Sequence, residues 1–195
     1  MAIRDKIIEL ADYWSSPGKY RPTEDELITF FTGSGAEAAP TQAEAREALT
    51  SLSYGVRVQG QIKHWCGIFA CYVLREAGVD VRWTLHGGKM VGAGITKLPG
   101  FKNIVLGDVA IIYAASHHFI VFDIDYDSNT LQSVDGNTAN QYIRVTEKKI
   151  QYTGQTLAQR ALSRSTALMV SSWASVPKPI GALVVEICAH REDSR

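Results

Sequence analysis

A nearly unbroken apolar run from Trp65 to Leu74 constrains the fold of this 195-residue chain more than any other feature. The run is typical of a helix, and Gly78 just after it suits a left-handed helix cap. Cys66 stands at the front edge of the run. A thiol there lies at the positive end of the helix dipole, and an imidazole from the strand-like segment that carries His118 could take its proton. The pattern indicates a reactive thiolate.

Size and charge limit what such a thiol could act on. A chain of 195 residues can bury a core within one domain. Its 20 Lys and Arg residues equal its 20 Asp and Glu residues, so no overall field attracts nucleic acid or an anionic membrane. We expect no nucleic-acid partner, and a small-molecule or peptide-like substrate fits better.

The cysteines do not indicate a disulfide scaffold. Cys66 and Cys71 lie on one predicted helix and point about 140° apart, so they can hardly bridge each other. Cys188 lies in an apolar run and is predicted to be a buried core thiol. No recognisable metal-ligand spacing connects the residues that could compose a metal site, and we expect neither metal nor cofactor. Those residues are Cys66, His86, His117, His118 and Asp135.

The amino terminus carries charges where a secretory signal needs an unbroken apolar core, and no segment approaches the length of a membrane span. We therefore expect synthesis in the cytoplasm without a general secretory signal. A substrate outside the cytoplasm would have to be reached by another route.

The first 53 residues are predicted to form a small helical lobe packed on the core. Apolar residues recur at helical spacing over 3–14. Thr23 with Glu26, and Thr41 with Glu44, form capping-box patterns that open helices reaching about Phe31 and Leu52.

Residues 54–195 are predicted to form the main domain, which begins with the Cys66 helix. Glycines and Pro99 make 80–102 mostly loop, and 151–178 is predicted to be an insertion. Short β-prone runs at 109–114, 118–124, 130–134 and 142–145 suggest an antiparallel sheet beside the helix, and 180–187 is predicted to be a last strand. The fold class is α+β.

Four segments together resemble a known family. They are WCGIFACYVL at 65–74, GDVAII at 107–112, HFIV at 118–121 and DGNT at 135–138. Their order and spacing are similar to the CHAP family, cysteine-dependent amidases and peptidases of bacterial cell walls that share a papain-like core with NlpC-type peptidases. The resemblance covers about residues 54–150. It implies a papain-like core in which the nucleophile helix packs on the antiparallel sheet.

The resemblance also implies roles for single residues. Cys66 would be the nucleophile, His118 the general base and Asp135 the acid that holds the imidazole, a position often occupied by glutamate in the family. Asn137 could orient the ring instead, since cysteine and histidine need only a hydrogen-bond acceptor. His117 departs from the family, which often has glycine there.

The neighbouring histidines present a choice. Consecutive side chains on a strand point to opposite faces, so only one ring is expected to look into the Cys66 site. We favour His118, which directly begins the segment that matches the family, with His117 as the alternative.

The function implied is hydrolysis of peptidoglycan, either between muramic acid and L-alanine or within the peptide stem or cross-bridge. An antibacterial effector delivered to the periplasm or cell wall of a target bacterium, or a phage lysin, would fit, and an effector would imply an immunity protein as partner. Two alternatives stay open: a cysteine protease or deamidase toxin that acts on a protein, and a non-catalytic binding module on the same fold.

Overall fold

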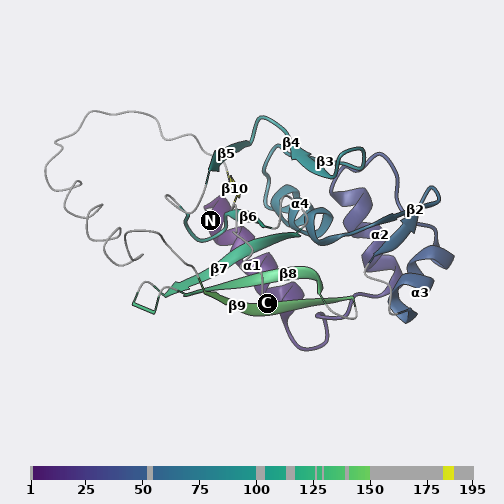
Figure 1. The fold of residues 1–195 in the computed structure, drawn as a ribbon, viewed down its shortest axis with the longest axis horizontal. Coiled ribbons are helices and arrows are strands. Elements are labelled where there is room, and N and C mark those ends of the chain that lie inside the picture. The colour runs from purple at the N-terminus through teal and green to yellow at the C-terminus, as the bar shows by residue number, and fades with distance from the viewer. Residues whose placement is uncertain are drawn as a thin grey trace, which may run out of the picture.

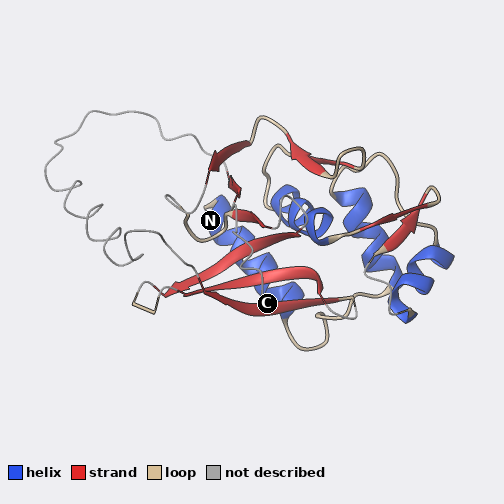
Figure 2. Cartoon of the chain, viewed as in Figure 1, coloured by secondary structure: helices blue, strands red, loops and turns tan. Residues whose placement is uncertain are grey.

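The chain adopts an α+β fold (Figures 1 and 2). A computed structural model describes residues 2–51, 55–99, 104–112, 117–125, 127–128, 130–138, 141–149 and 182–186. The predictions for 151–178 and for Cys188 lie outside these residues. No helix in the described ranges is long and apolar enough to cross a membrane.

The described helices are α1 (Ile3–Ser15), α2 (Glu24–Gly33), α3 (Gln42–Thr50) and α4 (Cys66–Glu76). Both predicted capping boxes are confirmed. The Thr23 hydroxyl accepts a hydrogen bond from the Glu26 amide, the Glu26 carboxylate accepts one from the Thr23 amide, and Thr41 with Glu44 repeats the arrangement. These bonds satisfy amides that a helix leaves unpaired in its first turn. Gly78 has a φ of 94°, as predicted for a left-handed cap.

The main sheet has six strands in the order β5-β10-β6-β7-β8-β9. Its strands are β5 (Ile95–Pro99), β6 (Val109–Ile112), β7 (His117–Asp125), β8 (Thr130–Thr138), β9 (Tyr142–Lys149) and β10 (Ala182–Glu186). From β6 to β9 the strands form an antiparallel meander. The last strand, β10, lies between β5 and β6 and pairs in parallel with both. The antiparallel pairing predicted for the strands between 109 and 145 is confirmed, and the parallel pairing of β10 with its two neighbours, which was not predicted, makes the sheet mixed.

Two small antiparallel hairpins stand apart from the main sheet. They are β1 (Val56–Val58) with β2 (Gln61–Lys63), and β3 (Arg82–Thr84) with β4 (Lys89–Val91). The second hairpin and β5 fall in the segment 80–102 that we predicted to be mostly loop. Gly87, Gly88, Gly92 and Gly94 lie in turns or bends between the short strands, and all except Gly94 have a positive φ. The glycines therefore indicated the turns correctly, but the strands between them were not predicted.

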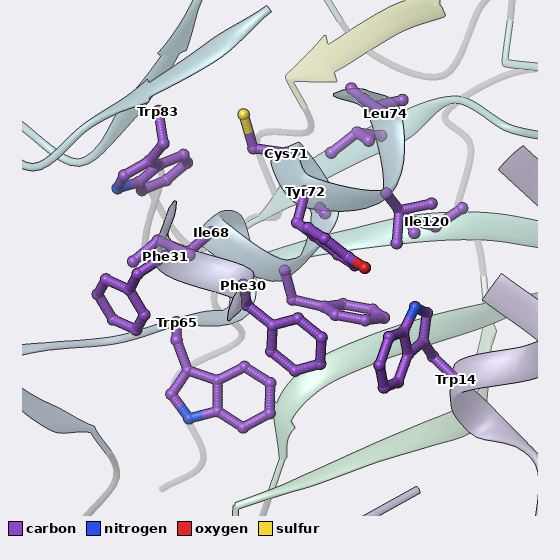
Figure 3. Close-up of a cluster of buried hydrophobic side chains, with 14 of the residues drawn as sticks. Trp14, Phe30, Phe31, Trp65, Ile68, Cys71, Tyr72, Leu74, Trp83 and Ile120 are labelled. Carbon is purple, nitrogen blue, oxygen red and sulfur yellow. The ribbon is translucent and has the colours of Figure 1, made fainter. Parts of the chain in front are cut away.

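Helices α1 and α4 pack on one face of the main sheet, and α2 packs on α4. The buried residues of these elements form one core, with Phe30 of α2 against Trp65 and Phe69 at the start of α4 (Figure 3). On the sheet, Ile120 and Val134 belong to this core. Phe119, Val121 and Leu131 belong to a smaller cluster, as expected when alternate residues of a strand face opposite sides.

Candidate active site

Cys66 is the first residue of α4, and its side chain is buried, with 3% of the residue exposed. Trp65, at the N-cap position, gives no side-chain capping bond to the helix within the described structure, because its indole N–H can only donate and the helix amides need an acceptor. The indole N–H donates instead to Oε1 of Gln141 at 2.6 Å. Helix-start amides carry positive potential. Cys66 thus combines a nucleophilic sulfur with backbone amides suited to stabilising an anion.

The helix lies unusually close to its neighbours at its second residue. A Cβ atom on Gly67 would lie 2.2 Å from the Trp83 ring and 3.0 Å from Nδ1 of His118. On the sheet side, a Cβ on Gly136 would lie 2.9 Å from Phe69. Only glycine at positions 67 and 136 allows this approach, which brings the beginning of α4 against β7 and β8.

A pocket of about 510 Å³ opens beside the Cys66 sulfur. It is lined by both small hairpins, by the start of α4 and by β7 and β8. Its walls include all but one of the predicted site residues: Cys66, His118 and Asn137, together with His117. Asp135 is absent from this lining and lies behind His117. The four predicted residues and the alternative histidine are therefore brought together at one site.

Asp135 contacts His117, and not His118 as we predicted. Its Oδ1 lies 2.5 Å from Nε2 of His117, with 22% of the histidine side chain and 2% of the aspartate side chain exposed. His118 instead packs its ring edge-on against Trp83, with ring centroids 5.1 Å apart. The reason is the period of the sheet: His117 lies on the Phe119 and Asp135 face, and His118 lies on the Ile120 face towards α4.

Both histidine rings nevertheless reach Cys66, so the expectation that only one could do so was wrong. His117 is the first residue of β7, and at this end of the strand the sheet meets the beginning of α4. Since Nε2 of His117 is held by Asp135, Nδ1 is the nitrogen left for the sulfur. Among described residues, Nδ1 of buried His118 has no hydrogen-bond partner.

The electrostatics favour a thiolate–imidazolium pair. Burial alone raises the pKa of the Cys66 thiol, but hydrogen bonds from His117 and His118 outweigh it and bring the pKa down to about 6. Burial lowers the pKa of His117, but Asp135 and Cys66 outweigh it and raise the pKa to about 9. Between these two values the sulfur is anionic and the His117 ring cationic.

The Asp135 carboxylate is itself held by three polar side chains that the sequence analysis missed. Lys148 donates to Oδ1 at 2.9 Å, and the hydroxyls of Ser133 and Thr146 donate to Oδ2. Burial raises the pKa of Asp135, yet His117 and Lys148 outweigh it and keep it low. Ser133 lies two residues before Asp135 on the same strand. Because residues two apart on a strand point to the same face, this contact could have been predicted from the sequence. Lys148 and Thr146 come from β9, whose register the sequence did not reveal.

Asn137 lies where β8 departs from regular pairing, between Asp135 and Thr138, and has a φ of 54°. Its side chain lines the pocket. Asp135 takes the orienting position on His117, because its Oδ1 lies 2.5 Å from Nε2 of that ring. Within the same ranges, no group of three or more His, Cys, Asp or Glu side chains could hold a metal ion.

The other cysteine of α4 is chemically different. Cys71 is buried and unbridged, like Cys66, which confirms that the two do not form a disulfide. Its thiol contacts the Ser34 carbonyl oxygen at 3.5 Å, and burial raises its pKa to about 12. Cys71 serves as an internal control for the reactivity of Cys66.

The paired titrations predict the pH dependence of thiol alkylation. Iodoacetamide reacts with thiolate, so the rate at Cys66 should rise through a midpoint of about 6, while Cys71 stays unlabelled at neutral pH. Peptide mapping by mass spectrometry after timed labelling from pH 4 to 10 measures both. A Cys66 midpoint at 8 or above, the range of an ordinary thiol, would contradict the ion pair.

Comparison with known proteins adds no identification. No family model, curated protein or solved structure matches the chain.

Proposed function

We propose that the protein is a cysteine-dependent amidase or peptidase with Cys66 as nucleophile, His117 as proton carrier and Asp135 as the residue that orients His117. The observation that carries the proposal is the chain of contacts from the sulfur through His117 to the buried carboxylate, which is 2.5 Å from Nε2. A nucleophile, a base and a third group that orients the base form the recurring arrangement of nucleophilic hydrolases.

The chemistry follows from the charges. The Cys66 thiolate would attack the amide carbonyl carbon, and the oxygen would take up negative charge beside the amides at the start of α4. The His117 imidazolium would give its proton to the leaving nitrogen as the C–N bond breaks. Water would then add to the thioester with neutral His117 as base, which releases the acid and restores thiolate and imidazolium.

The substrate we propose is peptidoglycan, cut as an amidase or as a stem or cross-bridge peptidase. Its support is the resemblance of segments 65–74, 107–112, 118–121 and 135–138 to the CHAP family, together with a pocket of about 510 Å³, large enough for a short peptide segment. Delivery to another bacterium as an effector, with an immunity protein as partner, belongs to the same proposal.

Digestion of purified sacculi tests this substrate. Wild-type protein should release soluble fragments whose masses identify the bond: intact peptides and peptide-free glycan for an amidase, shortened or uncrosslinked stems for a peptidase. A folded protein that leaves sacculi intact but cleaves or deamidates an unfolded protein substrate would favour the protein-directed toxin instead.

A further inference from the structure

The pocket beside Cys66 carries an unbalanced positive charge. Lys63, the last residue of β2, lines it, and so do His64, His117 and His118. Among the described residues that line the pocket, none is acidic. The charges of the Cys66 thiolate and the Asp135 carboxylate are matched by those of His117 and Lys148, so Lys63 supplies the excess.

The contacts of Lys63 leave its charge available to a ligand. Its Nζ donates to Oε1 of Gln61 at 2.8 Å and to the Leu85 carbonyl oxygen at 3.4 Å, and both acceptors are neutral. Within the described ranges, no carboxylate lies within 4.0 Å of Nζ. Glu37, near the same loop, accepts from the Leu85 amide and is not part of the pocket lining.

The position of Lys63 is also fixed. The bond to Leu85 joins the β1–β2 hairpin to the turn of the β3–β4 hairpin, two elements that form walls of the pocket. The side chain is half-buried, so its charge is screened less than that of an exposed lysine. A half-buried ammonium whose partners are only neutral oxygens is well suited to accept a carboxylate in a charge-assisted hydrogen bond.

We infer that this site selects an anionic substrate, an amide whose adjoining residue carries a free carboxylate, and that Lys63 is the residue that recognises it. The inference rests on the proposed function and adds the charge class of its substrate. Lys63 contacts substrate away from the reacting atoms, so it governs selectivity and leaves the nucleophile intact.

The first test needs no turnover. Iodoacetate and iodoacetamide deliver the same carbon to Cys66 and differ in charge. The ratio of the Cys66 alkylation rate with iodoacetate to that with iodoacetamide should fall about tenfold in Lys63→Met and further in Lys63→Glu. Lys63→Arg keeps the positive charge and should retain most of the wild-type ratio. Lys89→Met is the matched control, since Lys89 is exposed on the neighbouring hairpin and does not line the pocket. It should leave the ratio unchanged.

The second test uses hydrolysis of a matched pair of peptide amides that contain Ala-Glu-Lys or Ala-Gln-Lys. Wild type should prefer the Glu peptide in kcat/KM, and Lys63→Met should lose this preference. A ratio of alkylation rates unchanged in Lys63→Met overturns the inference. If neither peptide nor sacculi are cleaved but the alkylation ratio responds to Lys63, the hydrolase proposal fails and the anion-selective pocket stands.

Discussion

Replacing Cys66 with alanine should reduce amide hydrolysis by about four orders of magnitude or more, because loss of the nucleophile removes the covalent route altogether. Cys66→Ser should be nearly as inactive. A serine hydroxyl keeps the shape but does not ionise at neutral pH, whereas the pKa of the Cys66 thiol is about 6. The measurement is the initial rate of fragment release from sacculi, with the melting temperature recorded in parallel.

Both variants should remain folded, since Cys66 contributes only a small side chain at the end of the core. Cys71→Ala is the matched control on the same helix and should keep most of the activity, at some cost in stability because Cys71 is fully buried. If Cys66→Ala degrades sacculi at the wild-type rate, the mechanism is wrong and the site must be assigned another role, such as binding.

Replacing His117 with alanine should lower kcat/KM by about 10²–10⁴-fold, because the same ring stabilises the thiolate and carries the proton to the leaving group. The variant should also raise the midpoint of Cys66 alkylation towards that of an ordinary thiol, since His117 is the largest contributor that lowers the Cys66 pKa. Asp135→Asn should also lower kcat/KM, because it weakens the hydrogen bond that orients the His117 ring.

The comparison variant is His118→Gln, which keeps a polar group against Gly67 and Trp83. We expect His118→Gln to lower kcat/KM less than His117→Ala does, and to have a pH midpoint of Cys66 alkylation nearer to that of the wild type. The opposite outcome, an active His117→Ala and an inactive His118→Gln with both proteins folded, would return the general-base role to His118 and make the bond between His117 and Asp135 structural.

Local sequence signals were sufficient for most of the regular elements. The helix starts at Thr23 and Thr41 were predictable because each capping box is completed within four residues. The strands of the β6–β9 meander were predictable from short apolar runs between turn residues. The pairing of β10 with β5 and β6 could not be predicted in this way. Parallel partners lie far apart in the chain, and the sequence of a strand does not show which other strand it will pair with.

In the candidate site, too, some features could be predicted from local sequence and others depend on how the strands pair. Cys66 could be chosen as the candidate nucleophile from its position at the start of an apolar helix, and Asp135 as a candidate orienting residue from its place in the segment 135–138. The assignment of His118 over its neighbour relied on motif alignment, which is uncertain by one residue between adjacent histidines. A shift of one residue reverses the face of a strand, so only the observed pairing of β7 with β8 shows that Asp135 meets His117.

By itself, therefore, the sequence determined the position of Cys66 at a helix start, the capped helices before it and the α+β class, because each depends on interactions between residues close in the chain. The tertiary structure decided which histidine the carboxylate holds, which side chains hold that carboxylate, and that Lys63 is held against Leu85 in the wall of the pocket. These features depend on strand register and on the meeting of separate hairpins, where side chains distant in sequence come within hydrogen-bonding distance.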